Sequence, residues 1–266
     1  MRIGEDWYGN YGDGDIDVLS GSNRKMSLHL NNGSESFTTQ NVISSSTDLR
    51  PVSIYATDMD GDGDVDILGA AYSGDDISWW ENDGTPNNAD WTEYLVDGDF
   101  DGAVSIYATD MDGDGDVDIV GAAWIGDDIS WWENDGTPNN ASWTEYLIDG
   151  SFNGANSVYA TDMDGDGDVD VLGAAYGSDD ISWWENDGTP NNASWTEYIV
   201  DGDFDIAYSV YATDMDGDGD VDILGAARND NDISWWENDG TPNNADWTEY
   251  LVDGDFDGAV SIYATD

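Results

Sequence analysis

The residues with the clearest chemical potential are the carboxylates of the stretch DMDGDGDVD, which occupies residues 58–66. The same nine residues return at 110–118, 162–170 and 214–222, so the copies are spaced 52 residues apart. Each copy has aspartates at positions one, three, five, seven and nine, and a glycine at position six. Alternating carboxylates in a tight loop can converge on one point, the glycine permits the sharp turn, and position seven offers a backbone carbonyl. This oxygen-only ligand set predicts a site for a hard cation, Ca²⁺ in preference to Mg²⁺.

These loops follow the first nine positions of EF-hand calcium loops, without the bidentate Glu at position twelve. Transition metals would favour His or Cys, and the chain has one His and no Cys. The alternative is that Asp and Gly merely form turns on an acidic surface, which four identical copies between strands disfavour. The predicted ligands of four strong sites are Asp58, Asp60, Asp62, Asp64, Asp66, Asp110, Asp112, Asp114, Asp116, Asp118, Asp162, Asp164, Asp166, Asp168, Asp170, Asp214, Asp216, Asp218, Asp220 and Asp222.

A fifth, weak calcium site is predicted near the N-terminus, where the loop is damaged. Asp13, Asp15 and Asp17 keep positions five, seven and nine, but Tyr11 occupies position three. Position one holds no acid along the chain, although Asp266 could reach it if the two ends of the chain meet. We therefore expect this site to be weak or empty.

The elements that must position these loops belong to a 52-residue repeat. One repeat contains four extended runs rich in Val, Ile, Tyr, Trp and Thr, at residues 52–58, 65–72, 76–82 and 91–98, with turn-forming stretches between them. A repeat period near 50 is typical of solenoids and propellers. Four short antiparallel strands per unit are typical of a β-propeller blade. The predicted fold is therefore all-β, a single propeller domain over residues 1–266.

The two ends of the sequence predict how the ring closes. Residues 12–19 and 26–44 match strands two to four of a repeat, so the first unit lacks a strand one, and residues 260–266 supply one with nothing after it. That C-terminal strand can complete the first blade and remove an unpaired edge, giving five four-stranded blades. Alternatively, it completes the first blade of a neighbouring chain, giving a fibre by strand donation. The predicted blades are 9–46 plus 259–266, 52–98, 104–150, 156–202 and 208–254.

The charge balance excludes several classes of partner. The chain has 60 Asp and Glu against 5 Lys and Arg, a formal net charge of −55. Nucleic acid and anionic lipid would be repelled, and no 18-residue apolar run predicts membrane insertion. Aromatic residues make up 12% of the chain, including 14 Trp, which predicts a folded protein despite the charge.

The stretch SIYATDMDGDGDVDILGAAYSGDDISWWENDG, residues 53–84, resembles the FG-GAP/VCBS repeat family, whose best-known members are the integrin α-subunit propellers. DFDGA before strand one resembles the family's phenylalanine–glycine element, and DGDGDVDILGAA resembles its calcium loop and following strand. The resemblance covers nearly the whole chain. It implies a Ca²⁺-stabilised propeller, usually extracellular or on the cell surface and often in adhesion or carbohydrate recognition. Integrin-like members have seven units where five are predicted here, so the resemblance does not by itself imply an integrin mode of ligand binding. No secretory signal stands at Met1, so an exported protein would carry its signal outside this chain.

A ligand site is predicted on the face opposite the calcium loops. The loop between strands two and three differs most between the copies, and Tyr72, Trp124, Tyr176 and Arg228 occupy equivalent places in it. Aromatic side chains with acidic groups around a rim would suit sugars, by ring stacking and hydrogen bonding. The alternative is drift in a tolerant surface loop.

Other aromatic and acidic features are expected to serve the fold. In the pair Trp79-Trp80 and its copies, neighbouring residues of a strand point to opposite faces, and both faces of a blade are covered by other blades. His29, the only His, is expected to pack in the first blade rather than act as a base. We therefore expect no enzyme. The predicted function is a Ca²⁺-dependent recognition or adhesion module for glycans or surface proteins, with a self-assembling filament or matrix protein as the alternative.

Overall fold

The structure is a computed structural model of β-strands joined by short loops. It describes residues 17–22, 25–31, 37–44, 51–85, 91–140, 142–192, 194–244 and 247–265, and the backbone alone at 37–41. All regular secondary structure in these residues is β-strand, which confirms the all-β prediction. Across these ranges, the structure contains no helix with the length and apolar character needed to cross a membrane.

The strands form five antiparallel sheets. The first contains β1 (Val18–Ser22), β2 (Lys25–Asn31) and β3 (Phe37–Ser44). The second contains β4 (Pro51–Thr57), β5 (Asp66–Ala71), β6 (Asp76–Glu81) and β7 (Thr92–Asp97). The third contains β8 (Ala103–Thr109), β9 (Asp118–Ala123), β10 (Asp128–Glu133) and β11 (Thr144–Asp149). The fourth contains β12 (Ala155–Thr161), β13 (Asp170–Ala175), β14 (Ile181–Glu185) and β15 (Thr196–Asp201). The fifth contains β16 (Ala207–Thr213), β17 (Asp222–Ala227), β18 (Ile233–Glu237) and β19 (Thr248–Asp253).

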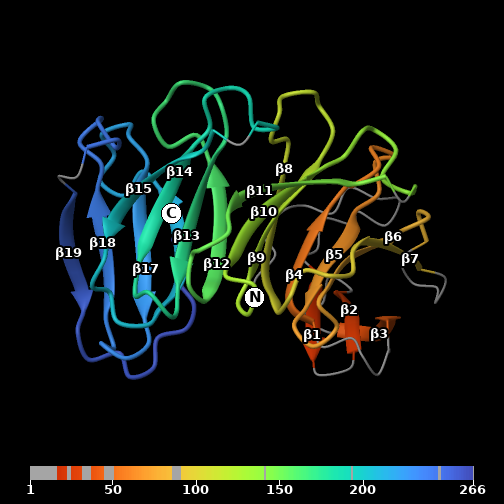
Figure 1. Cartoon of the computed structure of the whole chain (residues 1–266). Helices are drawn as coiled ribbons and strands as arrows, with labels where there is room; N and C mark the ends of the chain where they lie inside the picture. The colour runs from red at the N-terminus through yellow and green to blue at the C-terminus, as the bar shows by residue number, and fades with distance from the viewer. Residues whose placement is uncertain are drawn as a thin grey trace.

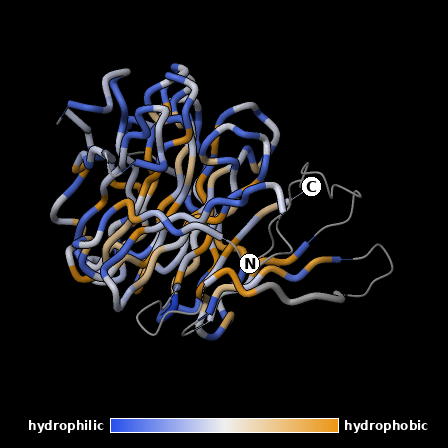
Figure 2. Tube along the Cα trace, turned by 90° about the vertical axis from the view of Figure 1, so that its right-hand side faces the viewer, coloured by the Kyte–Doolittle hydropathy of each residue, from blue (hydrophilic) through white to orange (hydrophobic). Residues whose placement is uncertain are grey.

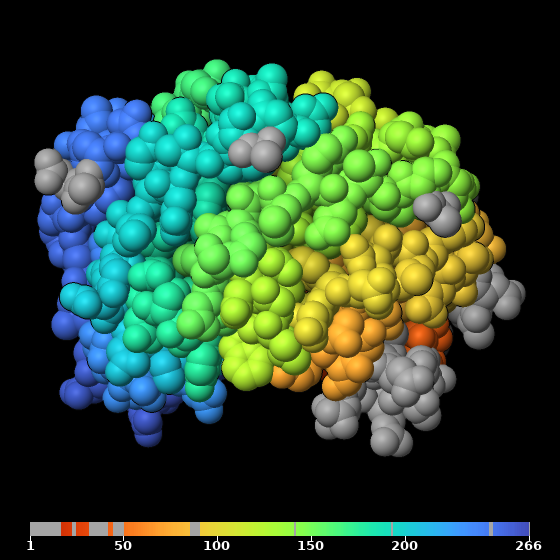
Figure 3. Space-filling view, viewed as in Figure 1, coloured from red at the N-terminus to blue at the C-terminus, as the bar shows by residue number. Residues whose placement is uncertain are grey.

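The sheets stand side by side in a fan, and each has its first strand toward the common centre (Figure 1). The first strands β4, β8, β12 and β16 contact one another in sequence, whereas the fourth strands β7, β11 and β15 are largely exposed. Figure 3 shows the sheets as adjoining bands along the molecule. The four strands predicted for one repeat agree with β4 to β7 to within one residue at each end. Runs rich in Val, Ile, Tyr, Trp and Thr with turn residues between them were sufficient signals, because each strand is short and sharply bounded.

The hydrophobic core lies between the sheets, where hydrophobic segments run through the strands and hydrophilic ones lie in the loops (Figure 2). Four buried clusters fill the interfaces between consecutive sheets. At the interface of the second and third sheets, Trp79 packs from one side and Trp132 from the other, and the ring of Phe100 meets Trp132 edge-on at 4.7 Å. Both members of the Trp79-Trp80 pair are buried, at 0% and 2% exposure, as their opposite orientations on β6 require.

Hydrogen bonds from buried indoles join the second, third and fourth sheets each to the sheet that follows. Trp131 of β10 donates its Nε1–H to the carbonyl of Pro190, in the loop between β14 and β15, at 3.1 Å. The copies of this bond join Trp79 to Pro138 and Trp183 to Pro242. A buried donor without a partner is costly, so these bonds fix which loop covers which sheet.

A second set of contacts lines the centre of the fan. Tyr55, Tyr107, Tyr159, Tyr211 and Tyr263, each 52 residues after the last, form a continuous row with centroids 4.7–5.2 Å apart. Serines of the first strands accept a hydrogen bond from the equivalent segment of the next repeat, as when the N–H of Ile262 donates to the Oγ of Ser209 in β16 at 3.3 Å. The segment at residues 260–265 therefore continues the row beside β16, although the structure assigns no strand there.

The predicted closure of the ring is not present in the described residues. The first sheet has three strands there, and no ladder joins it to residues 260–265. On the open face of the fifth sheet, Trp235 is only partly buried, whereas its copies Trp131 and Trp183 are at 0% exposure. A ring of five blades, in which the C-terminal segment completes the first blade as its fourth strand, therefore stays a prediction. Asp266 lies outside the described residues.

Ile206 sits in a strained backbone conformation, and its replacement gives a direct test of the fold. Its φ is 58°, in the left-handed region that is a genuine outlier for a β-branched residue. The equivalent Gly102, Gly154 and Gly258 have φ between 68° and 75° at no such cost. Because the left-handed conformation costs about 1–2 kcal/mol, we expect Ile206→Gly to raise the free energy of unfolding by about 1 kcal/mol. Denaturant titration measures it, with Ile206→Ala as the control that keeps the strain. A less stable Ile206→Gly variant would contradict this account.

Candidate functional site

The aspartate loops connect the first and second strands of four sheets, and their backbone turns are stabilised by the first aspartate. In the second sheet, Asp58 accepts hydrogen bonds from the N–H of Gly61 at 2.8 Å and of Gly63 at 3.0 Å. Both glycines have positive φ, 73° and 95°, which is why the loop requires glycine there. The same bonds recur in the other three loops. The carboxylates at positions three and five are thereby presented at the outer surface of the turn.

The aspartate at position nine is the buried anchor of the loop. Asp66 is 0% exposed and accepts the N–H of Met59 at 2.9 Å and of Asn82 at 2.8 Å, so its carboxylate ties the loop to the end of β6. Burial raises its pKa to about 8, although these two hydrogen bonds lower it. In the third and fourth sheets, burial likewise raises the pKa of Asp118 and of Asp170 to about 7.

Three carboxylates converge in each of the four loops, with ligand oxygens within 4.8 Å of one another. The groups take positions one, three and five in two loops and positions one, three and nine in the other two. Their members are Asp58, Asp60 and Asp62; Asp110, Asp112 and Asp118; Asp162, Asp164 and Asp170; and Asp214, Asp216 and Asp218. The side chain at position seven turns elsewhere: Oδ2 of Asp64 lies 2.8 Å from where a Cβ on Gly84 would stand. Position seven therefore has only its backbone carbonyl to offer, as the sequence pattern predicts.

The electrostatics of the loops favour a bound cation. Burial raises the pKa of Asp60, and the neighbouring carboxylates of Asp62, Glu81 and Asp58 raise it further. Glu81, at the end of β6, was missed by the sequence analysis, which read only the loop itself. Its Oε2 accepts the hydroxyl proton of Tyr94 at 2.8 Å, which holds the carboxylate beside the loop. An oxygen-only donor set with several negative charges fits Ca²⁺, so the residues present suit the ion that the pattern predicts.

The first loop retains the hydrogen bond of the position-nine anchor in the described residues, although Asp17 is only partly buried. Asp17 accepts the N–H of Asn31 at 2.7 Å, as Asp66 accepts that of Asn82. Asp13, Asp15 and Asp266, the other members of the predicted fifth site, lie outside the described residues. That site stays a prediction.

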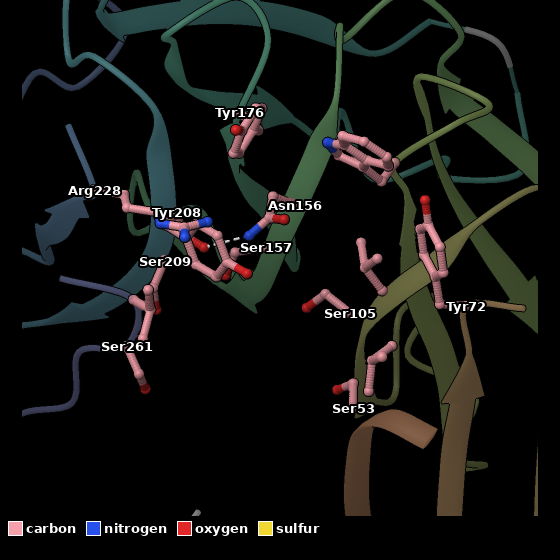
Figure 4. A pocket seen from close by; sticks show the side chains of 14 residues that line it. Ser53, Tyr72, Ser105, Asn156, Ser157, Tyr176, Tyr208, Ser209, Arg228 and Ser261 are labelled. Carbon is pink, nitrogen blue, oxygen red and sulfur yellow. Dashed lines mark hydrogen bonds between the residues drawn. The ribbon is translucent and has the colours of Figure 1, made fainter. Parts of the chain in front are cut away.

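A pocket of about 660 Å³ opens at the centre of the fan, on the face opposite the aspartate loops. Tyr72, Trp124, Tyr176 and Arg228, which the sequence analysis selected, all line it, each as the first residue after the second strand of its sheet. Ring contacts join the aromatic members: Tyr72 to Trp124 at 5.8 Å, and Trp124 to Tyr176 at 5.8 Å. Figure 4 shows Tyr72 and Arg228 on opposite sides of the opening, with the serines of the first strands beneath.

Tyr208 extends this row of rings and was missed by the sequence analysis. Its ring lies 6.4 Å from Tyr176, and the guanidinium of Arg228 lies 5.9 Å from its centroid. Asn156 donates its Nδ2–H to the carbonyl of Tyr208 at 2.6 Å. A signal for these two residues was present, because the equivalent positions of the other copies hold Val52, Val104 and Val260, while the neighbouring positions vary little.

The pocket differs from the predicted rim in one respect. Its fourteen lining residues are five Ser, three Val, three Tyr and single Trp, Asn and Arg residues, with no Asp or Glu among them. The acidic residues of the adjacent loop serve the fold instead. Asp75 has φ 58°, and its Oδ1 accepts the N–H of Gly102 at 2.8 Å, which links that loop to the turn before β8.

A fan of sheets, four of them four-stranded with an acidic loop between their first two strands, defines a tandem blade-repeat protein. The chain belongs to the FG-GAP-like repeat family, whose model matches residues 11–69, 58–121, 110–173 and 162–225. A search of curated proteins gave no match.

Solved structures with a similar fold have low sequence identity. The biofilm matrix protein Bap1 of V. cholerae is 17% identical with a TM-score of 0.54, over 98% of this chain and 40% of that one. This chain therefore spans less than half the length of Bap1. A protein from Lactobacillus plantarum is 13% identical with a TM-score of 0.53, over 92% and 67% of the two chains. A Bacteroides uniformis protein provisionally named a 6-phosphogluconolactonase is 14% identical with a TM-score of 0.55, over 92% and 69%. At these identities the likeness concerns the fold.

Proposed function

We propose that this chain is a non-enzymatic, Ca²⁺-stabilised recognition module of an extracellular or surface protein, and that it binds glycans in the central pocket. The observation that carries the proposal is the convergence of Tyr72, Trp124, Tyr176 and Arg228, from four different sheets, on one opening. Aromatic rings with nearby hydroxyls suit sugars, because the apolar face of a sugar packs on a ring while its hydroxyls find polar partners. The family and the matrix-protein neighbour support an extracellular or surface location.

Calcium in this proposal is structural. The ligands would be the carboxylates at positions one, three, five and nine and the backbone carbonyl at position seven. A bound Ca²⁺ would offset the repulsion among these groups. The buried anchor Asp66, bonded to the end of β6, would then transmit that stabilisation to the sheet.

The proposed ring closure places the first sheet against the open face of the fifth. Partly buried Trp235 supports this, because its copies are covered by the following sheet. The position of residues 260–265 beside β16 supports it as well, because Tyr263 there is 64% exposed and could be covered by the first sheet. The same two observations favour the alternative function, a self-assembling matrix or filament protein in which a second copy supplies that strand. Sedimentation separates the two, because closure within one chain gives a monomer at every concentration.

Aromatic substitutions in the pocket test glycan recognition. The ligand is a glycan that the wild-type chain binds on a glycan array. We expect Trp124→Ala and Tyr176→Ala each to weaken its binding by at least about tenfold, as truncation of a central aromatic contact does. Both side chains are half-buried at the pocket rather than in a sheet interface, so the variants should fold.

The matched control is Trp143→Ala, which removes a half-buried tryptophan of the same kind away from the pocket. Isothermal titration against the array hit gives the affinities. An array without hits, or full binding by both pocket variants, would contradict the proposal.

A further inference from the structure

The central pocket is distinguished from the rest of the molecule by its charge. Of the 266 residues, 60 are acidic, so fourteen lining residues drawn from the average composition would include about three carboxylates. The fourteen described residues that line the pocket include none. It does contain Arg228, one of only 5 basic residues in the chain. A site for a cation, or for a neutral ligand that requires carboxylate acceptors, would not be built in this way.

Arg228 has no counter-ion within the described part of the chain. The structure records no carboxylate within ion-pair distance of its guanidinium, which is exposed and lies 5.9 Å from the ring of Tyr208. Its backbone is nevertheless fixed, because its N–H donates to the carbonyl of Ile206 at 3.0 Å. A guanidinium carries five N–H donors in a planar fork that matches a carboxylate. Arg228 thus has a fixed backbone at the pocket and a guanidinium whose donors are available to an anion.

The serines beneath the rings add further donors. Ser53, Ser105 and Ser157 each accept a backbone N–H from the next first strand through Oγ, and Ser209 accepts that of Ile262, all at 3.1–3.3 Å. The hydroxyl proton is not used in those bonds, and none of these four serines donates to another described group. A hydroxyl that already accepts a hydrogen bond is available as a donor. The floor of the pocket therefore presents a row of O–H donors in addition to the guanidinium.

We propose that the pocket selects carboxylate-bearing saccharides, with the carboxylate on Arg228 and a sugar ring against Trp124 and Tyr176. This inference rests on the proposed glycan-binding function and names its ligand class. The aromatic row and the guanidinium lie within one opening, so one oligosaccharide can meet both (Figure 4). The strongly negative protein repels such a ligand at long range, but that field is screened beyond about 8 Å at physiological ionic strength. Selection therefore depends on the groups inside the pocket.

The test compares tetragalacturonic acid with its fully methyl-esterified form, which keeps the sugar rings and removes the charge. Isothermal titration at constant calcium and physiological salt uses the wild-type chain, Arg228→Tyr, Arg228→Lys and Lys25→Gln. The equivalent positions 72 and 176 hold tyrosine, so Arg228→Tyr removes the charge and places there an aromatic ring that the fold already accepts. Lys25→Gln removes one positive charge outside the pocket.

We expect the wild-type chain to prefer the acid over the ester by about tenfold or more, since a hydrogen bond to a charged group contributes about 1.5–3 kcal/mol. Arg228→Tyr should abolish the preference while binding the ester as before, Arg228→Lys should keep part of it, and Lys25→Gln should keep all of it. Equal wild-type affinity for acid and ester would overturn the inference and leave glycan binding intact.

A preference for the acid that survives in Arg228→Tyr would also overturn it, because the carboxylate would then be bound elsewhere, as by calcium on the opposite face. If neither probe binds, the inference fails, and an array without hits would then remove the proposed function as well.

Discussion

Chelation of calcium should lower the melting temperature of this protein by roughly 20 °C or more, or unfold it outright. A ligand that binds only the native state stabilises it by about 2.7 kcal/mol per site when its free concentration is 100 times Kd, which gives roughly 11 kcal/mol for four equal sites. At about 2 °C per kcal/mol for a chain of this size, the shift in melting temperature follows. The loss is distributed over the fan, because each loop is anchored to its own sheet by an aspartate at position nine such as Asp66.

Differential scanning calorimetry with calcium or EGTA measures this shift, and single variants assign it to the loops. Asp112→Asn, which alters one of the four groups, should reduce the effect of the chelator by about a quarter. Asp99→Asn makes the same charge change at an exposed turn outside the loops and should leave the effect unchanged. A melting temperature that EGTA does not move would mean that the aspartates are turn formers only. Equal effects of both variants would mean that calcium acts by general charge screening.

The repeat made the strands and loops predictable from the sequence. Aligning the four copies defines the repeat unit. The positions of strands and loops within it can then be read from all four copies together. The strands of the second sheet consequently agree to within one residue. Convergence of Tyr72, Trp124, Tyr176 and Arg228 could also be expected, because equivalent positions in blades around one axis face the same centre.

What the sequence did not predict depends on contacts between units. Glu81 approaches the acidic loop from β6 because of how two strands meet at one edge of the sheet, a relation that spacing within the loop does not contain. The acidic groups expected around the pocket rim are not in its described lining, and the carboxylate of Asp75 in the adjacent loop accepts the N–H of Gly102 before the next sheet. Closure of the ring is of the same kind, since it depends on the fit between two non-identical ends and not on the repeating pattern.

Removal of one buried indole should cost nearly as much stability as many small proteins possess. Trp131 is at 0% exposure, stacks on Tyr146 at 4.8 Å and donates to the carbonyl of Pro190 in the next sheet. Trp131→Ala leaves a cavity between two sheets and removes the bond between them, so we expect a loss of about 3–5 kcal/mol in the free energy of unfolding. Urea titration in saturating calcium measures it without interference from the metal sites.

The control is Trp143→Ala, because Trp143 differs from Trp131 mainly in how deeply its side chain is buried. Trp143 is a tryptophan that also donates to a proline carbonyl, that of Pro138 at 3.3 Å, but it stands at the partly exposed outer side of its sheet. Trp143→Ala should cost less than half as much as Trp131→Ala, because less apolar surface returns to water and the site can collapse or hydrate. Trp131→Phe should fall between them, since it keeps a ring and loses the donor. If the two alanine variants were equally destabilised, the stability of the fan would lie in the indole–carbonyl bonds and not in the packing between sheets, and the interface clusters would not be the source of its cohesion.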